Sequence, residues 1–179
     1  MYQKILVPVD GSETSMVGLK EAVKLAKSQG SQLRLVHVVN ELILDYSYGA
    51  SLSGTDVIEC LREGGRKIIR WAEALAREQG VQSDGVLLES IGGAAADSIL
   101  AHAKEWPADL IVMGTHGRRG LQSFFAMGSD AESVVRSASV PVLLVHDVAK
   151  ELRSPGVATV TTKAASAGTR EPPVITPLF

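Results

Sequence analysis

The sequence contains one cysteine and no long hydrophobic run. A single thiol, Cys60, cannot form an internal disulfide, which excludes disulfide-stabilised secreted domains and indicates a reducing compartment. No apolar stretch approaches the roughly 20 residues that cross a bilayer. The apolar stretch behind Met1 is also too short for a signal peptide. We therefore expect a cytoplasmic protein without a membrane partner.

The net charge and the aromatic content further limit the binding partners and the fold class that we expect. The formal net charge is −2 at pH 7, so nothing in this balance favours nucleic acid or a membrane surface as a partner. Aromatic residues make up 4 % of the chain, within a hydrophobic share of 45 %, so the core must consist of Val, Leu, Ile and Ala. These side chains are typical of a parallel sheet covered by helices.

Short continuous apolar runs alternate along the chain with helical periodicity. Continuous rather than alternating hydrophobicity indicates strands that are covered on both faces. The strands are expected at residues 4–10, 32–39, 81–88, 109–113 and 140–146. The helices are expected from Ser12 or Thr14 to Gly30, and at 55–80, 94–105 and 130–137. Five strands alternating with four helices predict an α/β fold with a five-stranded parallel sheet, doubly wound and Rossmann-like.

One domain is expected at residues 1–148, followed by a low-complexity tail at 149–179. The tail holds four of the seven prolines and cannot bury enough apolar surface to offset its ordering entropy, so we expect it to be disordered. Its more apolar end, 174–179, leaves a docking segment as the alternative. A mobile loop is expected at 40–54, and the pair Gly64-Gly65 indicates either a kink or a close approach within a helix.

A glycine-punctuated loop behind the fourth expected strand is the strongest functional feature. It begins at Gly114, continues through Gly117 and Arg118, and reaches Gly128-Ser129 at the start of a helix. Glycines let backbone N–H groups approach an anion, and a helix start adds unpaired N–H groups and the positive end of the helix dipole. Arg118 adds a charge-assisted donor. Neither the P-loop nor the dinucleotide fingerprint matches, so spacing alone leaves two alternatives, a phosphate-binding loop and a loop that merely turns.

Three segments are expected to meet at one edge of the sheet. Ligands of open parallel sheets bind outside the carboxyl ends of the strands, where the strand order reverses. Segments 8–10, 37–39 and 113–117 each end or follow an expected strand. The start of the glycine loop is therefore expected to lie near Asp10.

Five ordered motifs resemble those of the universal stress protein family. They are Lys4-Ile5-Leu6-Val7-Pro8-Val9-Asp10-Gly11-Ser12, Leu35-Val36-His37-Val38, Ala108 to Gly117, Gly128-Ser129, and Val140 to Val145. The resemblance runs from the first residues to about Asp147 and implies an adenine nucleotide alpha hydrolase-like fold. In the ATP-binding branch of that family, Gly-x-x-Gly, nine residues and then Gly-Ser/Thr hold the phosphates.

The resemblance implies ATP, with Mg²⁺, as the ligand of this edge. Asp10 would lie at the ribose or the adenine, and Met113 near the sugar. The base pocket would be lined by Pro8, Val9 and Val38. The phosphates would be held by Gly114, Gly117, Gly128 and Ser129, with Arg118 at the mouth of the loop. This chain departs from the pattern because ten residues, Arg118 to Met127, separate Gly117 from Gly128.

The expected function is that of an ATP-binding, nucleotide-gated regulatory protein of the stress response, with little or no turnover and no catalytic residue. One alternative is a non-nucleotide interaction module of the same fold, which the extra loop residue favours. Another is a slow ATPase or nucleotidyl transferase that uses Asp10 or His116. His37, within a buried strand, is expected to be structural.

The last expected strand also bears on assembly. Residues 140–145 would form an exposed hydrophobic edge in a monomer, and such an edge promotes association. Proteins of this resemblance commonly pair through that strand, so we expect a homodimer.

Overall fold

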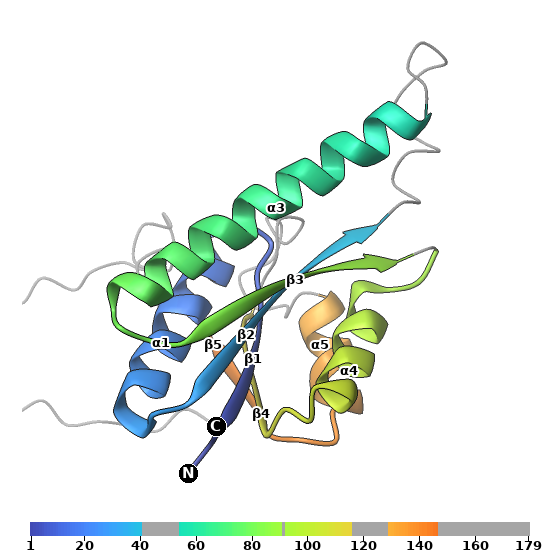
Figure 1. Ribbon diagram of the computed structural model, residues 1–179. Helices are drawn as coiled ribbons and strands as arrows, with labels where there is room; N and C mark the ends of the chain where they lie inside the picture. Colours follow the sequence, from blue (N-terminus) through green and yellow to red (C-terminus); the bar gives the residue numbers. More distant parts are fainter. Residues whose placement is uncertain (41–53, 91, 116–128, 147–179) are drawn as a thin grey trace, which may run out of the picture.

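The computed structural model describes residues 1–40, 54–90, 92–115 and 129–146 (Figure 1). Most of the loop expected at 40–54, the middle of the glycine loop and the whole of the expected tail lie outside the described residues. The strands are β1 (Lys4–Pro8), β2 (Gln32–Asn40), β3 (Ser83–Ser90), β4 (Leu110–Gly114) and β5 (Val142–Val145). The helices are α1 (Glu13–Gln29), α3 (Gly54–Glu78), α4 (Ala95–Glu105) and α5 (Ser129–Ser137).

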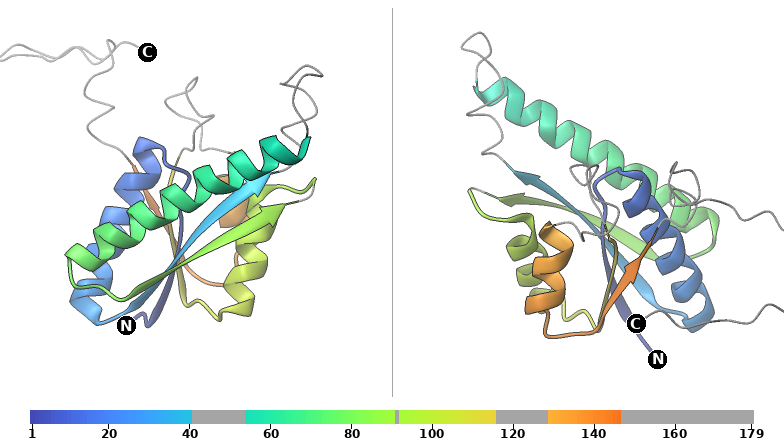
Figure 2. Two further views of the ribbon diagram at one scale, coloured as in Figure 1. Left: turned by 45° about the horizontal axis from the view of Figure 1, so that its top comes forward. Right: turned by 180° about the vertical axis from the view of Figure 1, so that it is seen from behind.

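The strands form one parallel sheet in the order β3-β2-β1-β4-β5. Helices α1 and α3 cover one face, and α4 and α5 cover the other (Figures 1 and 2). The chain moves outward from β1 through β2 to β3, then returns to the other side of β1 to form β4 and β5. The doubly wound fold is therefore confirmed, and its strand order reverses between β1 and β4.

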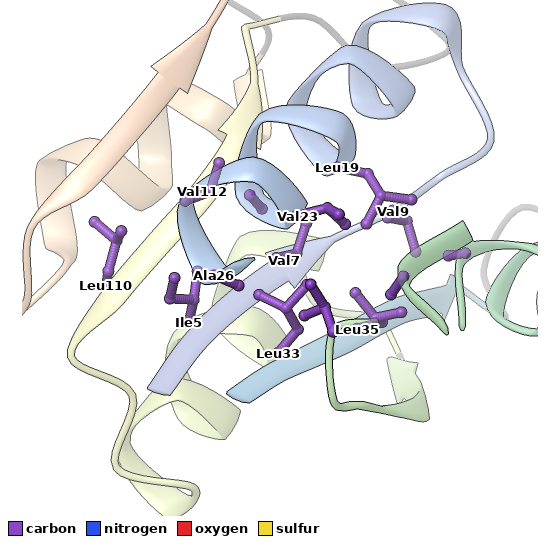
Figure 3. Close-up of a cluster of buried hydrophobic side chains, with 14 residues drawn as sticks. Ile5, Val7, Val9, Leu19, Val23, Ala26, Leu33, Leu35, Leu110 and Val112 are labelled. Atoms are coloured by element: carbon purple, nitrogen blue, oxygen red, sulfur yellow. The ribbon is translucent and has the colours of Figure 1, made fainter. Parts of the chain in front are cut away.

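Aliphatic side chains form the core on both faces, as the low aromatic content predicted. Under α1 and α3, buried residues of β1, β2 and β4 such as Val7, Leu35 and Val112 pack against Leu19 and Val23 (Figure 3). Under α4 and α5, a second cluster is built from the alternate strand residues, because successive side chains of a strand point to opposite faces. None of the helices in the described part of the chain has the length and apolar character needed to span a membrane.

Helix α1 begins where a side-chain cap is available. Of the two expected caps, Ser12 is the one used: its Oγ accepts a hydrogen bond from the Ser15 N–H at 3.1 Å. At the other end Gly30 takes a left-handed conformation with φ of 71°, which glycine adopts without a steric penalty. The expected end of this helix is thus confirmed.

Strand β3 begins two residues later than expected, at Ser83 rather than Val81. Gly80, with φ of 74°, turns the chain behind α3, and the Val81 N–H donates to the Ala76 carbonyl at 3.0 Å. Val81 therefore closes the end of the helix. An apolar residue at a helix end resembles the start of a strand in sequence, and only the backbone hydrogen bond separates the two.

The glycine pair in α3 marks a close approach. A Cβ on Gly65 would lie 2.6 Å from Leu87 Cδ1 and 2.7 Å from His37 Cδ2, whereas a Cβ on Gly64 would meet nothing within 4 Å. Because Gly65 has no side chain, α3 can pack directly against the His37 side chain of β2 and the Leu87 side chain of β3. Of the two alternatives left open by the sequence, close approach is the one observed at Gly65.

Candidate functional site

The turn between β1 and α1 holds the carboxylate of Asp10 in a fixed place. Asp10 Oδ1 accepts a hydrogen bond from the Ser12 N–H at 2.9 Å, and the Asp10 N–H donates to Ser15 Oγ at 3.3 Å. Gly11 between them has φ of 78°, a conformation that disfavours other residues. The carboxylate is therefore positioned at the carboxyl edge of the sheet, beside the positive end of the α1 dipole.

The end of β4 lies against the first turn of α1. A Cβ on Gly114 would lie 2.6 Å from the Thr14 carbonyl oxygen and 3.0 Å from the Ser15 nitrogen. From the helix side, a Cβ on Gly18 would lie 3.0 Å from the Gly114 nitrogen. Gly114 is thus required by backbone packing, a role that reasoning from the loop sequence missed.

Residue Thr115, directly behind β4, is bound to the neighbouring edge strand. Its N–H donates to the Val145 carbonyl at 3.1 Å, and its Oγ1 lies 3.3 Å from His146 Nδ1. These contacts hold Thr115, the second residue of the glycine loop, at the sheet edge on the side of β5.

The apolar residues expected at the site divide between the two faces of the sheet. Leu6 packs with the cluster under α4 and α5, as do Val38 and Met113, and Pro8 faces the same way because side-chain direction repeats every two residues. Leu6 pairs with Ile111, so continuing this register sets Pro8 level with Met113. Val9 points to the opposite face, 2 % exposed and next to Leu19 under α1 (Figure 3).

The remaining site residues belong to the glycine loop and its end. Gly117, Arg118 and Gly128 lie outside the described residues. Ser129 is exposed and is the first residue of α5. The described part of the site therefore combines apolar side chains on the α4/α5 face, the Asp10 carboxylate and the close contact between α1 and Gly114. Within the described ranges, no three His, Cys, Asp or Glu side chains gather as metal ligands.

A second polar cluster lies between β2, β3 and α4, with the Asp84 side chain partly exposed to solvent. Arg34 of β2 forms an ion pair with Asp84, and its Nη1 lies 3.2 Å from His102 Nε2. The guanidinium also stacks 4.8 Å from the centre of the Trp106 ring. Because a guanidinium only donates, Nε2 is the acceptor and the neutral imidazole carries its proton on Nδ1.

The pKa of His102 lies below its ordinary value of 6.5 because burial, and after it the charge of Arg34, disfavour the imidazolium. Glu105 and Asp84 oppose this shift in part. The unfolded chain therefore binds a proton more readily than the folded protein below about pH 6.5. The contribution of neutral His102 to stability is complete above that pH and is lost as the pH falls toward the lowered value.

We expect His102→Gln to reduce the loss of stability between pH 7 and pH 5. The glutamine offers an oxygen to Arg34 and does not titrate, so it removes the proton linkage while keeping an acceptor. Urea unfolding of both proteins across this range measures the effect. A difference in unfolding free energy that does not vary with pH would show that His102 does not titrate as described.

Comparison with known proteins agrees with this architecture. The profile of the universal stress protein family matches residues 1–146. A universal stress protein of Methanocaldococcus jannaschii is 35 % identical over 151 residues, which cover 84 % of this chain and 86 % of that protein. Universal stress protein YxiE of Bacillus subtilis is also 35 % identical, with 82 % of this chain and all of that protein covered (100 %).

Solved structures of the same family share the fold. Universal stress protein UspA from Lactobacillus plantarum superposes with a TM-score of 0.68 at 24 % identity, covering 80 % of this chain and 97 % of that one. The universal stress protein from Archaeoglobus fulgidus in complex with dAMP gives a TM-score of 0.56 at 27 % identity, again covering 80 % and 97 %. With family similarity across most of the sequence and the same fold, this chain belongs to the universal stress protein family.

Proposed function

We propose that this protein binds an adenine nucleotide, ATP in the first place, at the carboxyl edge of the sheet between β1 and β4. The observation that carries the proposal is the reversal of strand order between β1 and β4. Asp10 follows β1, and Gly114 is the last residue of β4. Open α/β sheets bind their ligands at such a point. The dAMP complex of the Archaeoglobus fulgidus relative supports an adenine nucleotide as the ligand.

Each part of a nucleotide has a matching part of the site in this proposal. The base lies against the apolar side chains of Pro8 and Val38, and Met113, of which 7 % is exposed, lies on the side of the sugar. Asp10 accepts hydrogen bonds from the ribose hydroxyls or the adenine amino group. Val9 contributes through its backbone, because its side chain is buried in the core.

The phosphates bind along the glycine loop and at the start of α5 in this proposal. The groups concerned are Gly114, Gly117, Arg118, Gly128 and Ser129. Unpaired N–H groups at a helix start and glycine backbone amides favour anions. Mg²⁺ usually keeps several waters and binds through one or two carboxylates together with substrate phosphates. Because Asp10 is assigned to the ribose or the adenine, the phosphates and the retained waters would supply most of the oxygens around Mg²⁺.

We further propose that the bound nucleotide acts as a regulatory signal in the stress response, with little or no turnover. Turnover of ATP requires a base or water-positioning group aimed at the γ-phosphate. The Asp10 carboxylate is committed through Oδ1 to the Ser12 N–H, which favours a binding role over that of a base. Slow hydrolysis is the enzymatic alternative.

A mass spectrum of the freshly purified native protein tests the ligand, and an ATP turnover assay tests the regulatory role. We expect co-purified adenine nucleotide and steady-state hydrolysis below one turnover per minute. Sustained turnover that is lost in Asp10→Ala would favour the ATPase. Protein free of nucleotide that also fails to take it up would favour the interaction module, to which the ten-residue spacing behind Gly117 points.

We also propose a homodimer that pairs through β5. This strand is the last in the sheet order, and Leu143 on it is 38 % exposed. An exposed apolar edge strand can pair with a second copy of itself. The dimer would place the β5 strands of the two copies side by side.

The Leu143→Lys variant is expected to shift the protein from dimer to monomer at micromolar concentration, because a charge on the pairing strand opposes association. Size-exclusion chromatography coupled to light scattering measures the molecular mass in solution directly. Lys67→Glu, an exposed charge reversal on α3, serves as the control and should leave the mass unchanged. A monomeric mass for the wild-type protein at this concentration would contradict the proposed homodimer.

A further inference from the structure

His37 of β2 connects the end of β1 to the helix that covers it. The imidazole is 7 % exposed, and its Nδ1 lies 2.7 Å from the Val9 carbonyl oxygen. A carbonyl accepts only, so Nδ1 is the donor. Strand β1 ends at Pro8, and the Val9 N–H still donates to the Val36 carbonyl at 2.8 Å. The imidazole therefore bonds the carbonyl of Val9, the first residue after β1, just where regular strand pairing stops.

Helix α3 holds this imidazole from the other side. Gly65 lies so close that a Cβ would be 2.7 Å from His37 Cδ2 and 3.3 Å from Nε2. One helical turn further, Ile68 contacts the next part of the same turn, because a Cβ on Gly11 would lie 3.2 Å from Ile68 Cδ1. Residues three apart share a helix face. One face of α3 thus covers both His37 and Gly11.

The structure assigns His37 a positioning role: together with Gly65 and Ile68 of α3, it fixes the turn from Val9 to Ser12 and so the place of Asp10. The inference rests on the proposed nucleotide site, whose carboxylate this turn carries. At the strand end of this turn, the Val9 N–H donates to the Val36 carbonyl, and the Val9 carbonyl accepts from the imidazole. Loss of the imidazole bond leaves a buried carbonyl to find a new partner, which shifts the turn.

Two His37 variants separate the hydrogen bond from simple packing. His37→Asn keeps an N–H the same number of bonds from the backbone as Nδ1, whereas His37→Leu fills the space without a donor. We expect His37→Leu to weaken binding of ATP and dAMP about tenfold, the effect of one lost hydrogen bond. We expect His37→Asn to stay within about threefold of the wild-type affinity.

Amide hydrogen exchange of the turn gives a readout that does not depend on nucleotide. The Ser12 N–H is bonded to Asp10 Oδ1, so its exchange reports the geometry of the turn. Exchange should accelerate in His37→Leu and remain near the wild-type rate in His37→Asn. If the Ser12 N–H exchanges at the same rate in His37→Leu and His37→Asn, the positioning role of His37 is wrong, whether or not nucleotide binds.

The two adjacent glycines of α3 provide a matched pair. Gly65→Ala pushes on His37 and should lower nucleotide affinity and speed Ser12 exchange in the same direction as His37→Leu. Gly64→Ala adds the same methyl group where nothing lies within 4 Å and should change neither. A wild-type protein that binds neither ATP nor dAMP, yet shows the expected exchange pattern, would overturn the nucleotide site while supporting the positioning of the turn. Unchanged exchange in Gly65→Ala would count against the role of α3.

Discussion

Gly114→Ala is expected to destabilise the protein by about 3 kcal/mol, because the added methyl group meets backbone on the facing helix. Its Cβ would lie 2.6 Å from the Thr14 carbonyl oxygen and 2.7 Å from the Thr14 carbonyl carbon. Backbone atoms cannot rotate away as a flexible side chain can, so α1 must move off β4. Urea unfolding followed by circular dichroism measures the loss in free energy.

Gly64→Ala is the control for this substitution, since the same methyl group enters open space on an exposed helix turn. It should leave stability unchanged or raise it by about 1 kcal/mol through helix propensity. A Gly114→Ala variant with wild-type stability would show that α1 does not approach β4 as closely as described. This contact does not involve a ligand. The experiment therefore tests the packing of α1 against β4, and it does not test nucleotide binding.

Asp10→Ala is expected to weaken nucleotide binding by about 2 kcal/mol, roughly thirtyfold, through loss of a charged hydrogen-bond acceptor. Asp10→Asn retains an oxygen for the Ser12 N–H and therefore keeps the turn, so it isolates the effect of the charge. Titration calorimetry with ATP measures both variants. We expect the asparagine variant to lie between the wild-type protein and the alanine variant.

Asp97→Ala, which removes an exposed carboxylate from α4, controls for the change in net charge. It should bind nucleotide as the wild-type protein does. Wild-type affinity in Asp10→Ala would contradict the proposed position of the ribose and base. Thermal unfolding of each variant without nucleotide separates a loss of binding from a loss of fold.

Most of the fold follows from short-range patterns of the sequence. Continuous apolar runs marked the strands because a parallel sheet is covered on both faces, and the order of strands and helices set the doubly wound class. The end of α1 was equally readable, since Gly30 carries its own conformational signal. The start of β3 was not, because Val81 looks like a strand residue until its hydrogen bond to Ala76 is seen.

The candidate site could be predicted only in outline. The position of Asp10 at the carboxyl edge follows from the topology, and so does the position of Gly114 at the end of the neighbouring strand β4. Which way Val9 points depends on strand register, which the first strand alone does not reveal. Glycine is required at positions 65 and 114 because each approaches an element distant in sequence. Gly65 lies against His37, and Gly114 lies against Thr14. A sequence shows such glycines but not what approaches them.

The Arg34 cluster was also missed, although the sequence carried a signal for it. An arginine within an otherwise apolar strand must find partners when the sheet is covered. Asp84 on the neighbouring strand and His102 on α4 supply them. Their pairing depends on the register of β2 with β3, which only the structure fixes.

The proposed function depends on binding of an adenine nucleotide, which titration calorimetry of the nucleotide-free native protein with ATP and Mg²⁺ measures. We expect saturable binding of one nucleotide per chain, competed by dAMP and weakened about thirtyfold in Asp10→Ala. The absence of any binding heat at millimolar ATP, together with an unchanged melting temperature at the same concentration, would contradict it.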